Sequence, residues 1–148
     1  MLSIHTDEHF MRQALQLAER AAEEGEVPIG AVVVSQFRII GKGYNQTERL
    51  QDPTAHAEML AITAACEHLR SKYLRDCTLY VTIEPCPMCA GALRWAQLER
   101  VVYGAGEEKF GSVHVRPSLF HPKTMVEGGL MEHDCAAIMQ EFFRSRRP

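Results

Sequence analysis

The sequence predicts an α/β fold in which helices cover both faces of a mixed β-sheet. In the second half of the chain, strand-like segments alternate with helical ones, which favours parallel strand pairing. In the first half, two apolar segments are separated only by a short turn at residues 36–38, which is typical of a β-hairpin. The chain of 148 residues has the length of one ordinary domain, and we expect residues 1–148 to form a single domain.

The first half of the chain begins with a predicted helix, followed by the hairpin. Thr6 can cap the helix, and apolar residues recur at helical spacing until Gly25, which ends the pattern. Residues 29–34 are β-branched and nearly continuous, which predicts a buried strand. Residues 39–44 predict its hairpin partner.

A polar segment follows the hairpin and leads into a second predicted helix. Residues 45–51 predict a loop. Asp52 followed by Pro53 predicts a helix start, because Asp is a good capping residue and Pro is favoured at the first helical position. This helix should run to about Leu69.

The second half of the chain predicts three strands, two helices and one long loop. A loop of this length in a small domain is usually functional or mobile. The expected strands are residues 79–83, 101–103 and 124–127; the expected helices are 87–96 and 131–146, and the loop covers 104–122.

The composition indicates a soluble protein of the cytoplasm. Hydrophobic residues make up 46% of the chain, and the formal net charge is −3, which gives no overall attraction for nucleic acid. We find neither an apolar signal region nor an apolar run of about 18 residues, so we expect no membrane association. The five cysteines are an odd number without a secretion signal, which argues against a disulfide framework.

Two cysteines and one histidine form the candidate metal site. Cys86 and Cys89 lie three residues apart at the start of a predicted helix, where unpaired N–H groups favour thiolates. His56 can supply a third ligand, and Glu58 places a free carboxylate beside it. Two sulfurs and one nitrogen suit zinc, and three protein ligands leave one position open, which indicates catalysis.

Two other interpretations of the cysteine pair stay open at this point. A Cys-x-x-Cys pair alone is often a redox motif, although Pro87 and Met88 between these cysteines do not fit that pattern. A structural zinc site would need a fourth ligand. The candidates for it are Cys77, His68 and Cys135, but we expect Cys66, Cys77 and Cys135 to pack as small hydrophobic residues.

The stretches His56-Ala57-Glu58 and Pro85-Cys86-Pro87-Met88-Cys89 match the signature of the zinc deaminases. Residues 26–31, 52–58, 79–92, 100–105 and 142–147 extend the match, and together they resemble the bacterial tRNA-specific adenosine deaminase family. The resemblance implies a cytidine deaminase-like three-layer α/β/α sandwich with a five-stranded mixed sheet. It also implies one Zn²⁺ per chain, a homodimer, and conversion of adenosine to inosine at the wobble position of the tRNA anticodon.

The resemblance also implies roles for individual residues. His56, Cys86 and Cys89 would hold zinc, and Glu58 would carry protons without binding the metal. The residues expected to contact the base or the anticodon stem-loop are Ile29, Asn45, the Ala57 backbone, Glu107, Lys109, Ser112, Phe142, Phe143, Arg144, Arg146 and Arg147.

Some of these residues have equally ordinary structural interpretations. Asn45 could form a turn after its strand, and at helical spacing only one of Phe142 and Phe143 should face inward. The loop between Gly111 and Val126 departs from the family pattern, so His114 and His121 receive no role. Two alternative functions stay open, a guanine, cytosine or nucleoside deaminase and a noncatalytic zinc-binding or RNA-binding module.

Overall fold

The computed structural model describes residues 6–146. Its five strands are β1 (Gly30–Ser35), β2 (Arg38–Tyr44), β3 (Cys77–Ile83), β4 (Arg100–Ala105) and β5 (Met125–Glu127). They form one sheet in the order β2-β1-β3-β4-β5. β1 pairs antiparallel with β2 and β3, whereas β4 pairs in parallel with β3 and β5. The predicted five-stranded mixed sheet is therefore confirmed.

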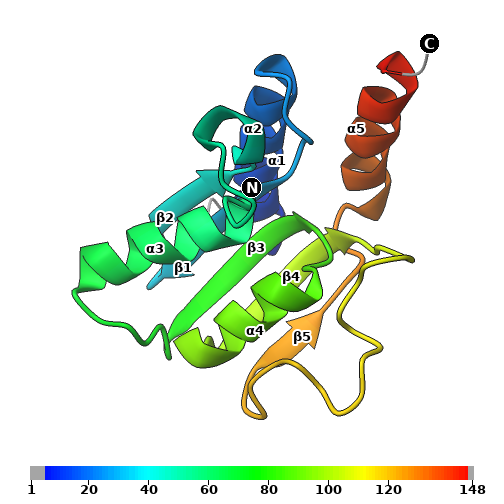
Figure 1. Ribbon diagram of the computed structural model, residues 1–148. Coiled ribbons are helices and arrows are strands. Elements are labelled where there is room, and N and C mark those ends of the chain that lie inside the picture. The colour runs from blue at the N-terminus through cyan, green and yellow to red at the C-terminus, as the bar shows by residue number, and fades with distance from the viewer. Residues whose placement is uncertain (1–5, 147–148) are drawn as a thin grey trace.

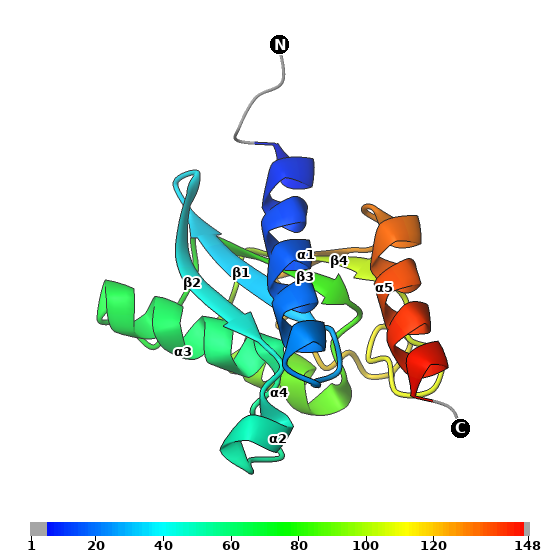
Figure 2. The same ribbon diagram turned by 90° about the horizontal axis from the view of Figure 1, so that it is seen from above.

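Helices cover both faces of this sheet, as Figures 1 and 2 show. The helices are α1 (Asp7–Glu23), α2 (Thr47–Leu50), α3 (Ala57–Leu69), α4 (Pro87–Ala96) and α5 (Glu132–Ser145). α3 and α4 enclose one hydrophobic core with the sheet, and α1 and α5 enclose a second core on the opposite face. The three-layer α/β/α sandwich is thus confirmed.

Helix α1 follows the prediction closely. The Thr6 side chain accepts a hydrogen bond from the backbone N–H of His9 at 3.1 Å, which is the expected N-cap. The apolar side is buried against the sheet, with Met11 and Ala14 fully enclosed. Arg100 on β4 forms an ion pair with Asp7 in the first turn, which joins this end of the helix to the sheet.

The position of α3 depends on two glycines in β2. A Cβ atom at Gly43 would collide with the carbonyl oxygen of Ala57, and one at Gly41 would collide with that of Ala61. Without side chains at these points, the helix backbone lies directly on the strand. This contact determines where the first turn of α3 lies, and with it the side chain of His56.

The predicted start of α3 at Pro53 is wrong, because the helix begins at Ala57. The Asp52 carboxylate instead accepts hydrogen bonds from the backbone N–H and the hydroxyl of Thr54, at 2.8 and 2.7 Å. This arrangement is a local turn, in which Asp caps its own backbone two residues later. His56 consequently becomes the N-cap residue of α3.

The predicted loop at 45–51 is also wrong in part, because it contains the short helix α2. The carboxylate of Glu26 accepts hydrogen bonds from the backbone N–H groups of Glu48 and Arg49, at 3.1 and 2.8 Å. Glu26 is 1% exposed, so a buried charge from a distant part of the chain stabilises the start of this helix. Local sequence could not indicate such a contact.

The remaining elements lie close to their predicted positions. Helix α4 has the predicted bounds, and β4 extends the short strand expected at 101–103. Residues 106–124 contain neither helix nor strand, which confirms the long loop. Cys77 and Cys135 are buried in the cores, as expected. None of the described helices could cross a membrane.

Candidate active site

The candidate metal ligands lie where the starts of two helices meet. His56 is the N-cap residue of α3, and Cys86 is the N-cap residue of α4. Two residues connect the end of β3 to Cys86. Cys89 lies in the first turn of α4 and is buried. Because unpaired N–H groups point out of a helix start, both helices favour negative charge at this point.

The ligating atoms of these residues face one another. The Nδ1 atom of His56 lies 3.7 Å from the Sγ atom of Cys86 and 3.4 Å from that of Cys89. All three atoms lie within 4.8 Å of each other, and together they could hold a metal ion. Among residues 6–146, this group contains no fourth His, Cys, Asp or Glu, which argues against the structural four-ligand site.

The two thiols of this group differ in their affinity for protons. A hydrogen bond from Cys89 lowers the pKa of the Cys86 thiol to about 4, and His56 adds to the effect. The pKa of Cys89 is raised, first by its bond to Cys86 and then by burial. The Cys86 thiolate in turn raises the pKa of His56. The first thiolate therefore forms at Cys86, beside the imidazole.

Glu58 lies beside this group without belonging to it. Its side chain is 3% exposed, and burial raises its pKa to about 7. Because α3 begins at Ala57, His56 and Glu58 lie on either side of the helix start, and both can reach a site at that end. A carboxyl group with this pKa can accept and release a proton near neutral pH.

A cavity of about 390 Å³ opens onto these residues. Its lining includes His56, Glu58 and Cys86, together with Ile29 and Glu107, whose contact with the substrate stays a prediction. The sequence interpretation missed the other lining residues, which are Ile83, Glu84, Pro87, Met88, Phe110 and Met139. Of these, Glu84 directly precedes the Pro85–Cys86 motif. An acidic residue so close to a candidate metal ligand was the signal by which the sequence could have indicated it.

Asn45 and Ala57 lie near this cavity but not in its lining. The Asn45 side chain accepts a weak hydrogen bond from the backbone N–H of Thr47 at 3.4 Å, which is a turn contact. Its own backbone N–H donates to the carbonyl oxygen of Ile29 at 3.1 Å. Ala57 is fully buried in the first turn of α3. Contact of either residue with a base stays a prediction.

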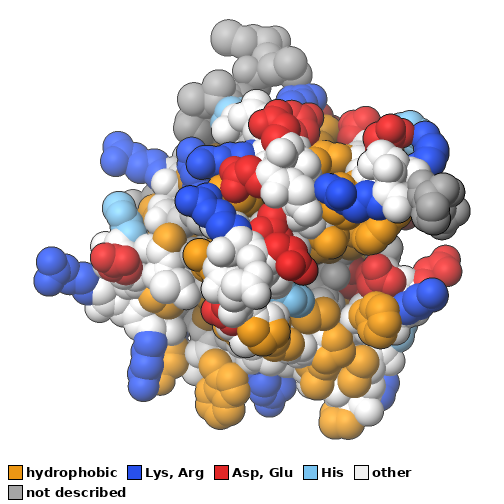
Figure 3. All heavy atoms as spheres, turned by 45° about the horizontal axis from the view of Figure 1, so that its top comes forward, with side chains coloured by type: hydrophobic (Ala, Val, Ile, Leu, Met, Phe, Trp, Pro, Cys, Tyr) orange, Lys and Arg blue, Asp and Glu red, His pale blue; other side chains and the backbone are white. Residues whose placement is uncertain are grey.

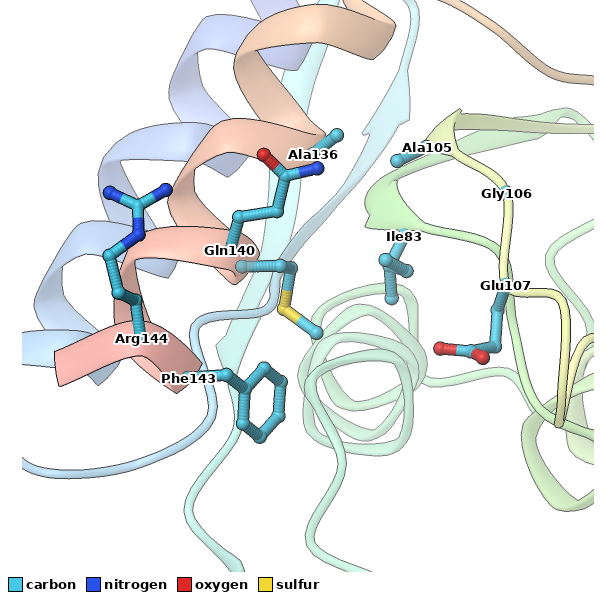
Figure 4. A pocket seen from close by; sticks show the side chains of 9 residues that line it. Ile83, Ala105, Gly106, Glu107, Ala136, Gln140, Phe143 and Arg144 are labelled. Carbon is cyan, nitrogen blue, oxygen red and sulfur yellow. The ribbon is translucent and has the colours of Figure 1, made fainter. Parts of the chain in front are cut away.

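A second cavity of about 520 Å³ adjoins the first, with Ile83, Glu107 and Met139 lining both. Figure 4 shows Gln140, Phe143 and Arg144 on α5, opposite Glu107 across this cavity. Phe142 is buried whereas Phe143 is 46% exposed, so only one of the two faces inward, as predicted. The two cavities share three wall residues and lie one after the other between Glu58 and α5, and we refer to them together as the recess.

Of the basic residues predicted near the C-terminus, Arg144 lines the second cavity. Arg144 forms an exposed ion pair with Glu141, and the guanidinium of Arg146 lies over the Phe142 ring, 4.3 Å from its centroid. Arg147 lies outside the described residues.

The loop after β4 carries the remaining predicted contacts. Lys109 is exposed, and its backbone N–H donates to the Glu107 carboxylate at 3.0 Å. Ser112 is 1% exposed and donates to the carbonyl oxygen of Pro85 at 2.6 Å, which gives it an anchoring role in the protein. Its contact with RNA stays a prediction. His121 accepts a hydrogen bond from the backbone of Lys123.

Comparison with known proteins identifies relatives over almost the whole chain. Residues 5–147 match the model of the MafB19-like deaminase family. A tRNA-specific adenosine deaminase of Aquifex aeolicus is 43% identical, with 95% of each chain covered. A chloroplastic tRNA(adenine(34)) deaminase of Arabidopsis thaliana is 44% identical over 95% of this chain, which spans only 12% of that longer protein.

Solved structures with the same fold include enzymes of two kinds. A structure from a study of A-to-I editing by tRNA:A34 deaminases has a TM-score of 0.83 and 44% identity, and the match covers 88% of this chain and 98% of that one. A guanine deaminase from Bacillus subtilis has 44% identity with a TM-score of 0.66, over 68% of this chain and 65% of that one. Because the family model and the Aquifex relative both match nearly the whole chain, this chain belongs to the MafB19-like deaminases and, among them, to the tRNA-specific adenosine deaminase family.

Proposed function

We propose that this protein converts adenosine to inosine at the wobble position of a tRNA anticodon by zinc-dependent hydrolysis. The observation that carries the proposal is the buried Glu58 carboxylate beside a His56–Cys86–Cys89 group that leaves room for one further ligand. The Aquifex relative, which matches this chain over 95% of both sequences, supports the choice of tRNA as substrate. A noncatalytic zinc module would have no use for a buried acid at this place.

The donor atoms fit zinc in their chemistry and in their spacing. A tetrahedral ion with Zn–S bonds of about 2.3 Å and Zn–N bonds of about 2.0–2.1 Å holds sulfur and nitrogen roughly 3.6 Å apart. The two Nδ1–Sγ distances in this structure are 3.7 and 3.4 Å. We therefore assign the zinc ligands as Nδ1 of His56 and the two cysteine sulfurs.

The residues around the metal have distinct roles in the reaction. Zinc, when bound, makes water a usable nucleophile at neutral pH by lowering its pKa from about 15.7 toward about 7. Glu58 takes a proton from the attacking water and delivers it to a ring nitrogen of adenine, and then assists protonation of the departing amine. One water is consumed and one ammonia is released for each adenosine converted to inosine.

The recess from Glu58 to α5 offers space for RNA beyond the target base. Anticodon loops present unpaired bases, so placing one adenine in the cavity requires less unstacking than a duplex would. Phe143 gives an exposed aromatic surface at the far end of the recess, beside Arg144. Such a pair suits stacking against a neighbouring base and contact with a phosphate.

The surface charge agrees with local rather than general attraction for RNA. Figure 3 shows Lys and Arg side chains interspersed with Asp and Glu, and hydrophobic side chains gathered in the lower half of the same face. With a formal net charge of −3, binding has to depend on a basic rim. We propose Arg144 and Arg146 for that rim, with Lys109 in the loop after β4 as a further contact. Arg147, also expected to contact RNA, lies outside the described residues.

We further infer a homodimer in the cytoplasm. The family resemblance implies the dimer, and helix α4 offers a surface for it. Met88 and Trp95 are 39% and 77% exposed, and they lie seven residues apart on one side of α4. Gly91 between them leaves open space in which a second helix could approach closely. A second copy of this chain is the occupant we assign to this surface.

Turnover of defined substrates tests the proposed function directly. The purified protein is incubated separately with an anticodon stem-loop RNA carrying adenosine at the wobble position, with free adenosine, with guanine and with cytosine. We expect inosine and ammonia from the RNA only. Guanine is the informative competitor, because the Bacillus subtilis enzyme is similar in sequence. Turnover of guanine or cytosine without turnover of the RNA overturns the proposal.

A further inference from the structure

A buried carboxylate beside the metal ligands holds the loop that forms one wall of the catalytic cavity. Glu84 follows β3 and precedes Cys86 by two residues, and it is 7% exposed. Its Oε1 atom accepts a hydrogen bond from the backbone N–H of Glu107 at 3.0 Å, and its Oε2 atom accepts one from that of Val113 at 2.9 Å. One side chain therefore bonds both ends of the segment 107–113.

The segment is shaped around this carboxylate. A Cβ atom at Gly111 would collide with the Glu84 carboxylate, so the loop backbone passes against it at a point where no side chain fits. The backbone N–H of Gly111 donates to the carbonyl oxygen of Glu107 at 3.1 Å, which closes the loop on itself. The hydroxyl of Ser112 bonds to Pro85, directly after Glu84.

This segment carries residues that line the cavity. Glu107 and Phe110 contribute to the cavity wall, and Glu107 also lines the second cavity toward α5, where Figure 4 shows it opposite Phe143. Phe110 is 68% exposed, so its own packing holds the segment weakly. Hydrogen bonds that backbone N–H groups donate to a buried carboxylate are strong and directional, and these two join the loop to the strand end that leads to Cys86.

We propose that Glu84 is a positioning residue that holds the segment 107–113 in its substrate-binding shape and thereby sets the affinity for RNA. The role rests on the proposed function, because the bound substrate is taken to be an anticodon loop. It predicts a change in KM rather than in kcat, since Glu58 and the metal ligands keep their places on α3 and α4.

The direction in which KM changes distinguishes the positioning role of Glu84 from a simple effect of its charge. Glu84→Gln keeps the size of the side chain but turns one oxygen into an NH₂ group, which faces an N–H donor and cannot accept from it. Loss of negative charge near RNA would by itself strengthen binding. Loss of the bonded loop weakens binding. A rise in KM is therefore expected from the positioning role and not from the charge.

The experiment compares Glu84→Gln, Gly111→Ala and the control Glu108→Gln with the unchanged protein. Glu108 is exposed in the same loop, and none of the described hydrogen bonds or ion pairs involves its side chain. We measure kcat and KM for the stem-loop RNA, zinc content, and backbone amide exchange at residues 107 and 113. Gly111→Ala keeps the carboxylate of Glu84 but puts a methyl group against it, which forces the loop and the carboxylate apart, so it should reproduce the effect of Glu84→Gln.

The expected result is a rise in KM of about tenfold or more for both loop variants, given the strength of hydrogen bonds to charged groups. Zinc content and kcat should stay near their original values, and amide exchange at residues 107 and 113 should accelerate. The control Glu108→Gln, which removes a charge from the same loop but none of its described hydrogen bonds, should leave KM unchanged or lower it. An unchanged or lower KM in Glu84→Gln, or a loss of kcat and zinc with unchanged amide exchange, overturns the role. If the unchanged protein does not act on RNA, the proposed function fails. Amide exchange at residues 107 and 113 in Glu84→Gln then still shows whether Glu84 holds the loop.

Discussion

His56 and Cys86 hold equivalent positions in two different helices. Each is an N-cap residue in extended conformation, with φ and ψ of −75° and 155° for His56 and −72° and 169° for Cys86. The Nδ1 atom of His56 and the Sγ atom of Cys86 are 3.7 Å apart. The site is therefore built from two helix starts that face each other, and both helices favour the negative charge that a dithiolate site carries.

Replacing Glu58 should abolish most of the activity and leave the metal in place. We expect Glu58→Gln to lower kcat by at least about 10²–10⁴-fold, the usual contribution of general acid–base catalysis. Zinc content should not change, because Glu58 is not one of the ligands that we propose. Inosine formation and metal analysis check the result.

A matched control for this variant is Glu67→Gln, which removes an exposed carboxylate from the same helix. The control should retain full activity. Near-normal turnover in Glu58→Gln would exclude Glu58 from proton transfer.

Removing a metal ligand should abolish zinc binding and lower the stability of the protein. Cys89 is fully buried, and in Cys89→Ala the remaining two ligands cannot complete the site. Metal bound only by the folded state stabilises it, so the temperature of unfolding should fall in this variant and in chelator-treated protein. Cys66→Ala, outside the site, should keep stoichiometric zinc. Stoichiometric zinc in Cys89→Ala would contradict the proposed ligands.

The metal-free protein should show an unusually acidic thiol. The pKa of Cys86 is lowered to about 4, so its thiolate population rises as pH rises through about 4 and is nearly complete at pH 6. Its alkylation by iodoacetamide should therefore be almost independent of pH between about 6 and 8. Burial raises the pKa of Cys66, so alkylation there should still increase about tenfold per pH unit in that range. Mass spectrometry of the labelled peptides checks both slopes. A tenfold increase per unit at Cys86 would show that its thiol is not perturbed.

Neutralising the basic C-terminus should weaken RNA binding and reduce its dependence on salt. For Arg144→Gln combined with Arg146→Gln, we expect the slope of log affinity against log salt to fall by about 0.7–0.9 for each phosphate that the protein no longer neutralises. Arg12→Gln is the control, because Arg12 also forms an exposed ion pair within its helix, with Glu8. Binding isotherms at several salt concentrations measure the slopes. An unchanged slope in the double variant would exclude this rim, while the zinc chemistry would stand.

Changing the exposed surface of α4 should dissociate the proposed dimer. A carboxylate at position 95, as in Trp95→Glu, would be buried without a partner in a helix–helix interface. We expect light scattering to give the mass of a monomer for this variant and of a dimer for Trp95→Phe, which keeps an aromatic side chain. A dimer in both variants would place the interface elsewhere.

Local sequence patterns predicted the elements of the fold in most places. Capping by Thr6, the β-branched run before residue 35 and Pro87 at the start of α4 act within a few residues, and each element lies where its pattern indicated. The two departures share a cause. Asp52 forms a turn where it was expected to cap a helix, and Glu26 stabilises a helix where a loop was expected. A side chain can bond to more than one backbone group, and only the folded chain decides which.

The chemistry of the site was determined by residue types and spacing, because His-x-Glu and Pro-Cys-x-x-Cys combine metal ligands with one free acid. The tertiary structure decided how these residues meet. Nδ1 of His56 faces the two sulfurs, and burial raises the pKa of Glu58 to about 7. Glu84 bonds both ends of a loop that lies more than twenty residues away. Orientation, burial and long-range hydrogen bonds depend on how distant segments pack, so the sequence alone determined which groups are present and packing determined what each of them can do.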